Sequence, residues 1–305
     1  MKLLLTGDWH LRYKKPEMRL DENYFEIQAG KVRQILEIAA KEGCKAILQP
    51  GDFFDSVETP WFVVQYYLKM LKRIFCVPGQ HDLRHHTREV ENTPLGVLDA
   101  AESVRLINDF GYMMTENQKG LMIYGVWWGT GIPPIKRKED FCNILLMHKM
   151  VLQKKLWLGQ TDFVYARDLL KNHPEFDLFV TGDNHQAFVE GETEKGRTRY
   201  VVNCGSLMRS NIDQVDHKPR VYIYDTEGKS LEEILLKVAP VKKVLDIKKA
   251  EVQKERDERL ELFISNLKQG EKGTTFDFID RLYEVMNDKK VGQEIREIIE
   301  EALGK

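Results

Sequence analysis

The chain has 305 residues, enough for one large core or for one core with an appendage, and its composition is that of an ordinary globular protein. Its 46 basic and 48 acidic residues give a net charge of −2, so overall charge gives no sign of a nucleic-acid binder and any basic surface must be local. The four cysteines form no Cys-x-x-Cys pair, which favours buried, reduced thiols in a reducing cytosol. No apolar run is long enough to span a membrane.

The first hundred residues alternate short apolar runs with amphipathic segments. Apolar periodicity and turn signals predict strands at 2–6, 46–50 and 73–77, and helices at 21–43, 61–72 and 93–101. An alternation of this kind predicts β-α-β units with parallel strands.

From residue 121 the predicted strands follow one another more closely. They lie at 121–126, 143–148, 177–181, 199–204 and 220–224, with a helix at 163–171. After Pro240 the sequence becomes highly charged, with apolar residues at helical spacing. We therefore expect a main domain over 1–240 and a helical region over 241–305. That region is either a cap on the core or a docking element for a partner.

Two of the early strands end in short strings with residues that bind metals. The string GDFFD at 51–55 follows the second strand, and its glycine lets the backbone turn so that Asp52 lies at the rim of the sheet. The string GDWH at 7–10 follows the first strand. Because alternate residues of an extended segment face the same way, Asp8 and His10 point together. Taken singly, each string is better explained by a surface turn.

Further strands end in residues of the same kind. His81 follows the third strand in the string PGQHD, and His148 closes the strand at 143–148. Asp183 and His185 follow a later strand and repeat the alternate-residue spacing of the first strand end. The strings are therefore much more specific in combination than singly.

Carboxylates and imidazoles spread over separate strand ends describe a two-metal site better than a structural zinc site, which shows cysteines in close pairs. Two divalent ions clamp a phosphate and hold a hydroxide ready for in-line attack. The leaving oxygen then needs a proton, and a histidine outside the ligand set is the natural donor. Asp52 is the candidate for the carboxylate that both ions share.

The series of strings resembles that of the calcineurin-like metallophosphoesterases. Within that superfamily the chain is similar to the SbcD-type DNA recombination and repair nucleases, including phage-encoded ones. The most telling strings are DWHL at 8–11, GDFFD at 51–55 and GSLMR at 205–209. The resemblance covers roughly residues 1–240 and implies an α/β fold, a four-layer α/β/β/α sandwich, with a small helical C-terminal region.

The resemblance also implies two ligand sets. The first metal set consists of Asp8, His10 and His185, together with the shared Asp52. The second metal set consists of Gln80, His148 and Asp183, together with the same Asp52.

The remaining roles concern proton transfer and substrate. The resemblance implies that His81 is the general acid, and Asp55 is placed either to orient it or to cap a turn. Arg12, Arg84 and Arg209 are candidates for contacts with the substrate phosphates.

The sequence departs from the family pattern at two positions of the second metal set. Gln80 stands where the family has Asn, which keeps the amide oxygen but lengthens its reach by a methylene. Asp183 stands where the family has His, which replaces a neutral nitrogen ligand with an anionic oxygen. Oxygen ligands favour manganese or magnesium. We expect the extra negative charge to tighten ion retention and to weaken the activation of water.

The function implied by the resemblance is that of a two-metal DNA phosphodiesterase of a recombination or repair complex. It would act as an exonuclease, with endonuclease activity left open. Two Mn²⁺ ions are the expected cofactors, with Mg²⁺ as the alternative. An SbcC-like coiled-coil ATPase is the expected partner, in the cytoplasm of the cell or of a phage host. The sequence neither supports nor opposes a homodimer.

Two other functions remain open at the sequence level. One keeps the chemistry and changes the substrate to small phosphodiesters or phosphoproteins, although Asp82 argues mildly against the phosphoprotein branch, which typically has Glu there. The other is a non-catalytic metal-binding subunit whose site is degraded at Gln80 and Asp183. It ranks third because His81 and Asp52 are both present.

Overall fold

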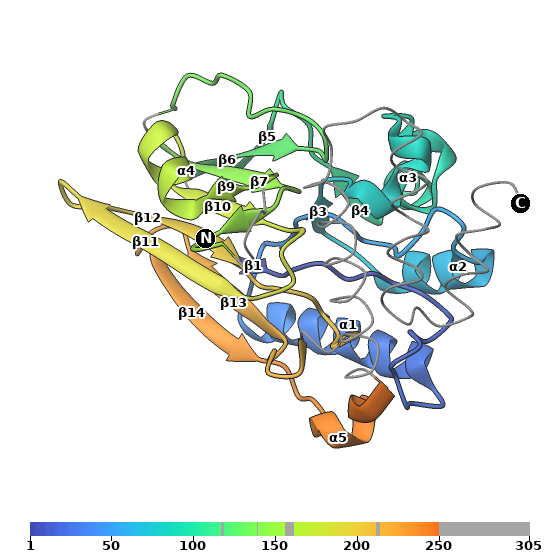
Figure 1. Cartoon of the computed structure of the whole chain (residues 1–305). Coiled ribbons are helices and arrows are strands. Elements are labelled where there is room, and N and C mark those ends of the chain that lie inside the picture. Colours follow the sequence, from blue (N-terminus) through green and yellow to red (C-terminus); the bar gives the residue numbers. More distant parts are fainter. Residues whose placement is uncertain (117–118, 139, 156–161, 212–213, 250–305) are drawn as a thin grey trace, which may run out of the picture. The chain divides into compact units, whose positions relative to one another are not determined.

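Two mixed six-stranded sheets form the centre of the computed structural model, which describes residues 1–116, 119–138, 140–155, 162–211 and 214–249 (Figure 1). The first sheet has the order β14 (Ser230–Leu235), β13 (Arg220–Asp225), β1 (Lys2–Leu5), β2 (Ala46–Gln49), β3 (Ile74–Cys76) and β4 (Val104–Leu106). The second has the order β11 (Phe188–Glu194), β12 (Arg197–Asn203), β10 (Leu178–Thr181), β7 (Phe141–Met147), β6 (Lys119–Val126) and β5 (Tyr112–Glu116). Two short strands, β8 (Val151–Leu152) and β9 (Val164–Tyr165), pair separately.

The central strands of both sheets are parallel. Strands β1 to β4 run the same way in the first sheet, and β6, β7, β10 and β12 do so in the second. Antiparallel pairing occurs toward the edges, where β13 lies between β1 and β14, β5 pairs with β6, and β11 pairs with β12. Because parallel strands end at the same edge of a sheet, the segments that follow them collect at one place.

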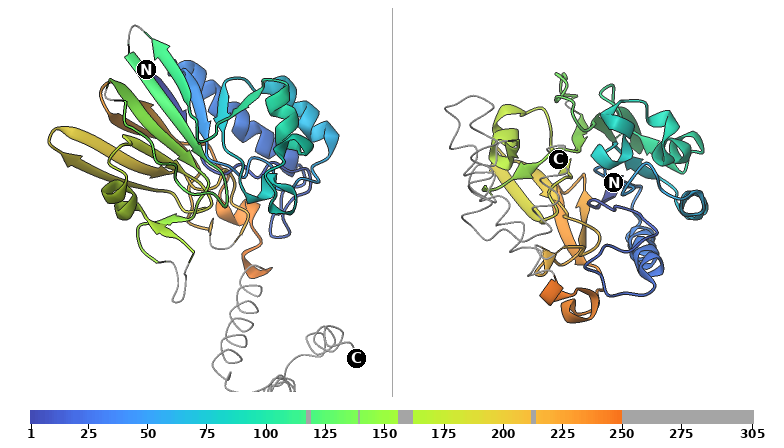
Figure 2. Two further views of the ribbon diagram at one scale, coloured as in Figure 1. Left: turned by 90° about the horizontal axis from the view of Figure 1, so that it is seen from above. Right: turned by 45° about the vertical axis from the view of Figure 1, so that its right-hand side comes forward.

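Helices cover the outer faces of the two sheets, as the view from above shows (Figure 2). Apolar side chains of α1 (Tyr24–Lys41), α2 (Trp61–Met70) and α3 (Pro94–Ala100) share one buried cluster with the first sheet. Those of α4 (Ala166–Asn172) share another with the second sheet. A third cluster lies between the sheets. The three clusters are the three interfaces of a four-layer α/β/β/α sandwich, so the predicted fold is confirmed.

The alternation of side chains along the strands explains these layers. In β1, Leu3 and Leu5 lie in the cluster between the sheets, whereas Leu4 packs under the helices. In β7, Ile144 lies between the sheets and Leu145 packs toward α4. Both faces of the central strands are thus covered, and most of the residues in β1, β2, β7 and β10 are apolar, as in parallel strands buried on both faces.

One predicted element is wrong in its first part. We expected a helix over 163–171, but Val164 and Tyr165 form β9, which pairs with β8, and the helix α4 begins only at Ala166. The strand residues are β-branched and aromatic, which favours extended backbone. The short helix α5 (Val241–Val244) falls at the start of the predicted helical region, whereas the sequence patterns do not predict the strands β4, β5, β8, β11 and β14.

The described residues up to Ile247 belong to one compact unit. Most of the predicted helical region 241–305 lies outside the described residues, so the boundary at 240 stays a prediction. Cys76, Cys142 and Cys204 are buried free thiols, and Cys44 is half-buried. Among the described helices, none combines the length and the apolar character that crossing a membrane requires.

Candidate metal centre

The predicted ligands lie at the carboxyl ends of five parallel strands, three in one sheet and two in the other. Contacts between the two groups of strand ends join the sheets. The backbone N–H of Asp183, after β10, donates to Asp8 Oδ2, after β1, at 2.9 Å. The Nδ1–H of His148, after β7, donates to the Pro50 carbonyl, after β2, at 2.8 Å. The fold thus brings together residues up to 175 positions apart in the chain.

A buried carboxylate fixes the two loops that carry Asp52 and His81. Asp82 Oδ1 accepts a hydrogen bond from the backbone N–H of Phe54, and Oδ2 accepts from those of Phe53 and Gly79, at 2.9 to 3.0 Å. Burial, together with the charge of Asp52, raises the pKa of Asp82 to about 7. In the sequence, Asp82 served only to argue against the phosphoprotein branch, and no pattern predicted that it fixes these loops.

Glycine is required where these loops touch. A Cβ on Gly79 would lie 2.2 Å from both the backbone nitrogen and Oδ1 of Asp52. A Cβ on Gly182 would lie 2.5 Å from Asp8 Oδ1. The glycines of the strand-end strings therefore allow the ligand loops to approach one another closely, and any other residue would separate them.

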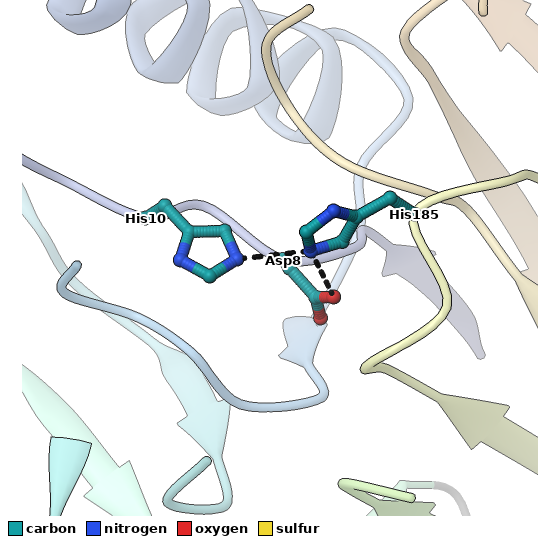
Figure 3. A group of neighbouring side chains, drawn as sticks. All are labelled: Asp8, His10 and His185. Carbon is teal, nitrogen blue, oxygen red and sulfur yellow. Dashed lines mark hydrogen bonds and ion pairs between the residues drawn. The ribbon is translucent and has the colours of Figure 1, made fainter. Parts of the chain in front are cut away.

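The first metal set is tightly grouped (Figure 3). The Nε2 atoms of His10 and His185 are 3.1 Å apart, and His185 Nε2 is 3.6 Å from Asp8 Oδ2. One ligand atom from each of the three residues lies within 4.8 Å of the others. Nitrogens that share one ion at about 2.1 Å each lie about 3.0 to 3.4 Å apart, so the histidine spacing fits a common ion.

The protonation of these groups also suits a metal. Burial lowers the pKa of His10 to about 3 and lowers the pKa of His185, so both imidazoles are neutral and offer lone pairs. Burial raises the pKa of Asp8 well above its usual value. The proximity of a cation would favour the charged form of that carboxylate.

Asp52 lies between the two sets. Its Oδ2 is 3.7 Å from His10 Nε2 and 3.4 Å from His148 Nε2, and its Oδ1 accepts the backbone N–H of His81 at 2.9 Å. Burial acts to raise the pKa of Asp52, but its interactions with the neighbouring histidines, of which the charge of His148 is the largest, more than offset this effect, so the pKa lies well below its usual value. Asp52 is therefore ionised and near ligands of both sets.

His148 is fully buried and held in one orientation. Its Nδ1–H bond to the Pro50 carbonyl leaves Nε2 directed toward Asp52, the arrangement by which protein groups orient metal-binding histidines. Burial lowers the pKa of His148, but the charge of Asp52 outweighs this and raises it to about 10. Without a metal ion, His148 is thus protonated at neutral pH.

The second metal set is less tightly grouped than the first. Among the described residues, the two groups whose ligand atoms converge are Asp8–His10–His185 and His10–Asp52–His81, and neither includes His148 or Asp183. Gln80 is half-buried and begins the short 3₁₀ helix η1 (Gln80–Asp82). Burial raises the pKa of Asp183. The charge of His148 acts to lower this pKa, and the charge of Asp52, a smaller effect, acts to raise it.

Unpaired buried atoms indicate that the residues present fit divalent cations. Among the described residues, six buried side-chain atoms have no hydrogen-bond partner, and three of them are Asp8 Oδ1, His10 Nδ1 and His148 Nε2. A buried polar atom without a partner destabilises the folded state. A bound ion would provide a partner for Asp8 Oδ1 and for His148 Nε2. His10, Asp52 and Asp183 also have positive φ angles (44°, 48° and 72°), a backbone strain that gathers at functional sites.

His81 lies beside the first metal set but is more exposed. Its side chain is 41% exposed, and its Nε2 is 3.9 Å from Asp52 Oδ2. Its Nδ1–H donates to the backbone carbonyl of Asp55 at 2.9 Å. Asp55 therefore contacts His81 through its main chain. The Asp55 carboxylate instead forms an ion pair with Arg12 and lies 3.6 Å from His10 Nδ1.

A pocket of about 190 Å³ opens over this cluster. Its lining includes Asp8, His10, His81 and His185, and also Arg12, whose guanidinium pairs with Asp55. We call it the metal pocket.

The other two predicted substrate contacts lie elsewhere. Arg84 is exposed and pairs with Glu58 at 3.0 Å. Arg209 is buried, donates to the Ala239 carbonyl and lines a different pocket. Of the three arginines predicted to contact substrate, Arg12 is the one that lines the metal pocket. The backbone of the GSLMR string does reach the site, because the Leu207 N–H donates to the Asp8 carbonyl at 2.8 Å.

Gln28 is a supporting residue that sequence reasoning missed. It is fully buried on α1, where its Nε2 donates to the carbonyls of Trp9 and His10, and its Oε1 accepts the N–H of Arg12. Three bonds from one side chain thus hold the loop that carries Asp8 and His10. The available signal was a polar residue among the buried positions of an amphipathic helix, which is exceptional unless its hydrogen bonds are satisfied.

Comparison with known proteins identifies a family for the chain. Residues 1–191 match the family of calcineurin-like phosphoesterases. Solved structures also match, among them one described as a novel archaeal phosphodiesterase, at 16% identity and a TM-score of 0.42, covering 77% of this chain and all of that chain. At that level the likeness bears on neither substrate nor mechanism. No curated protein matches the chain.

Proposed function

This chain belongs to the calcineurin-like phosphoesterase family, whose members hydrolyse phosphate esters with divalent metal ions, and on that premise we propose that it is a manganese-dependent DNA nuclease of the SbcD type. The observation that carries the proposal is the convergence of ligand-bearing strand ends around Asp52, with buried ligand atoms left unpaired beneath an open pocket. The strings DWHL, GDFFD and GSLMR support DNA as the substrate.

The residues of the metal pocket divide the chemistry among them. When bound, the divalent ions polarise the phosphate and activate the attacking water. Arg12 lines the pocket and binds a phosphate oxygen. His81 donates a proton from Nε2 to the leaving oxygen, because its Nδ1–H is held by the Asp55 carbonyl and Nε2 is the nitrogen near Asp52. The exposed position of His81 leaves room for a polymer on either side of the phosphate.

The donor set supports manganese as the metal. Asp8, Asp52 and Asp183 supply carboxylate oxygens, and Gln80 supplies an amide oxygen. A set rich in oxygen with a few imidazoles suits Mn²⁺, and Mg²⁺ is the second choice.

We also propose that the nuclease acts with an SbcC-like coiled-coil ATPase that docks on residues 241–305, most of which lie outside the described residues. The apolar residues at helical spacing in that region support the proposal. Copurification of the full chain with such an ATPase, but not of a chain ending at residue 247, is the expected result. Equal copurification of both would contradict the docking role. Size-exclusion chromatography with light scattering would decide whether the chain is a homodimer.

A substrate panel tests the proposed activity. The purified full chain and His81→Ala are each incubated with linear double-stranded DNA, a chromogenic phosphodiester and a phosphopeptide, in Mn²⁺ or in Mg²⁺. We expect Mn²⁺-dependent degradation of DNA that is lost in His81→Ala. Cleavage of the small diester or the phosphopeptide without cleavage of DNA would contradict the nuclease. Metal binding without turnover of any substrate would indicate a binding subunit.

A further inference from the structure

A second pocket lies beside the metal pocket and is lined by buried cations. Its volume is about 220 Å³, and its lining includes Arg19, Lys31 and Arg209, which come from the loop before α1, from α1 itself and from the loop after β12. The three residues are only 4%, 6% and 6% exposed. Arginine and lysine are almost never so buried unless they are paired, so the cluster needs an explanation.

The contacts of these cations account for little of their charge. Arg19 pairs with Asp21 at 2.6 Å and donates to the Arg209 carbonyl at 2.7 Å. Lys31 donates to the carbonyl of Lys237, and Arg209 to that of Ala239. A guanidinium carries five N–H donors and an ammonium carries three, so each cation has more donors than these bonds use.

The charges that line the pocket do not balance. Among the described residues of the lining, Asp21 is the one acidic residue, against three buried cations and Lys237. Burial, together with the charges of Arg209 and Arg19, lowers the pKa of Lys31 to about 8. At neutral pH the pocket therefore keeps an excess of positive charge, which an anion would neutralise.

The second pocket adjoins the metal pocket. Met208 lines both. The guanidinium of Arg19, which lines the second pocket, lies over the ring of Tyr24, which lines the metal pocket, at 5.2 Å from the ring centroid. Met208 and the Arg19–Tyr24 contact therefore lie between the two pockets.

We infer that the second pocket binds a phosphate group through Arg19, Lys31 and Arg209. Resting on the proposed nuclease function, we assign that group to the DNA strand, as a phosphate next to the one held in the metal pocket. The site would then hold the strand in register without reading its sequence, as phosphate contacts do.

Lys31→Gln tests the inference with little risk to folding. Glutamine keeps a donor for the Lys237 carbonyl and removes the charge, so the melting temperature should hold or rise as repulsion from the arginines is relieved. Lys31→Arg keeps the charge. Lys41→Gln is the matched control, because Lys41 is an exposed lysine of the same helix.

Binding is measured in EDTA on the full chain, by fluorescence anisotropy with a labelled DNA duplex and by calorimetry with inorganic phosphate. Lys31→Gln should weaken binding of DNA about tenfold and should reduce the slope of log affinity against log salt by about 1. Lys31→Arg and Lys41→Gln should bind as the wild type does. Inorganic phosphate should bind the wild type and lose affinity in Lys31→Gln.

The outcomes separate this inference from the proposed nuclease. In one outcome the wild type degrades DNA in Mn²⁺, and Lys31→Gln binds DNA and phosphate as tightly as the wild type does. That outcome would overturn the phosphate site but would support the nuclease. A wild type that binds inorganic phosphate through Lys31 but neither binds nor degrades DNA would keep the anion site and overturn its assignment to a DNA strand.

Discussion

The two proposed metal sets both include Asp52, but their other ligands differ in protonation and in spacing. In the first set, the Nε2 atoms of His10 and His185 already lie 3.1 Å apart, and burial keeps both imidazoles neutral. In the second set, His148 carries a proton that Asp52 stabilises, and both departures from the family pattern lie there. We therefore expect the first set to accept an ion without a change of protonation, and the second set to release the proton of His148 when it binds an ion.

This difference shows how a shared ligand couples unlike sites. The charge of Asp52 attracts the proton of His148 and also attracts either metal ion. The proton and the second ion therefore compete for the same place, whereas the first ion meets imidazoles that are already neutral. The following changes test this contrast, from the largest expected effect to the smallest.

Asp52→Asn should remove both ions and with them all measurable hydrolysis. The substitution keeps the shape of the side chain but removes the charge that lies between His10 and His148. Two ions that each contribute several kcal/mol amount to more than about 10⁵-fold in rate. Mn²⁺ content after gel filtration and hydrolysis of DNA are the measurements, with the exposed Asp109→Asn as the control. Two ions retained in Asp52→Asn would show that Asp52 is not shared.

His81→Ala should lower the rate of DNA cleavage about 10²- to 10⁴-fold and leave the number of bound ions unchanged. The residue is exposed and is held through the Asp55 carbonyl, which suits a proton donor better than a ligand. A chromogenic diester with a good leaving group should lose less rate than DNA, because it needs less help from an acid. If an ion is lost in His81→Ala, then His81 belongs to a metal set.

Asp183→His restores the family residue and replaces an anionic oxygen ligand of the second set with a neutral nitrogen. We expect retention of the second ion to weaken about tenfold, or about 1.4 kcal/mol, because a carboxylate is lost. The rate of hydrolysis should rise several-fold because the ions withdraw charge from water more strongly. Affinity is followed by Mn²⁺ titration and rate on the chromogenic diester. Unchanged affinity and rate would refute the assigned role of Asp183.

Loading with Mn²⁺ at pH 7 should release a proton from His148. Although burial acts to lower its pKa, Asp52 raises it to about 10, so the metal-free histidine is charged and must become neutral to bind. Raising the pH toward 10 should therefore strengthen binding of the second ion. Calorimetry in buffers of different ionisation enthalpy gives the number of protons released when Mn²⁺ binds. We expect His148→Asn to release about one proton fewer than the wild type and His185→Asn to release the same number as the wild type. Equal counts would remove the contrast between the sets.

The sequence predicts which strand ends carry the site because strand ends follow from local patterns of residues. Strand ends are marked by apolar runs followed by glycine, and the parallel arrangement of β1, β2 and β3 then brings Asp8, Asp52 and His81 to one edge. The alternation of helices and strands likewise predicts the covered sheets. Each of these inferences needs only the period of the pattern and the rule that parallel strands end together.

What the sequence does not predict depends on tertiary contacts. Asp82 and Gln28 turn inward to bond backbone groups of loops that are distant in sequence. Arg209 turns away from the metal pocket, because its guanidinium meets the Ala239 carbonyl. The direction of a loop side chain is set by partners that no local period reveals, so the sequence does not show where these three side chains point.

An equilibrium titration of the full chain with Mn²⁺, followed by electron paramagnetic resonance, tests the two-ion centre most directly. We expect the wild type to bind two ions that are magnetically coupled, as ions sharing Asp52 would be, and Asp183→Ala to bind one ion without coupling. The tighter of the two sites should be the first metal set, so His185→Asn should weaken the first ion bound. A wild type that saturates with a single uncoupled ion would contradict the account.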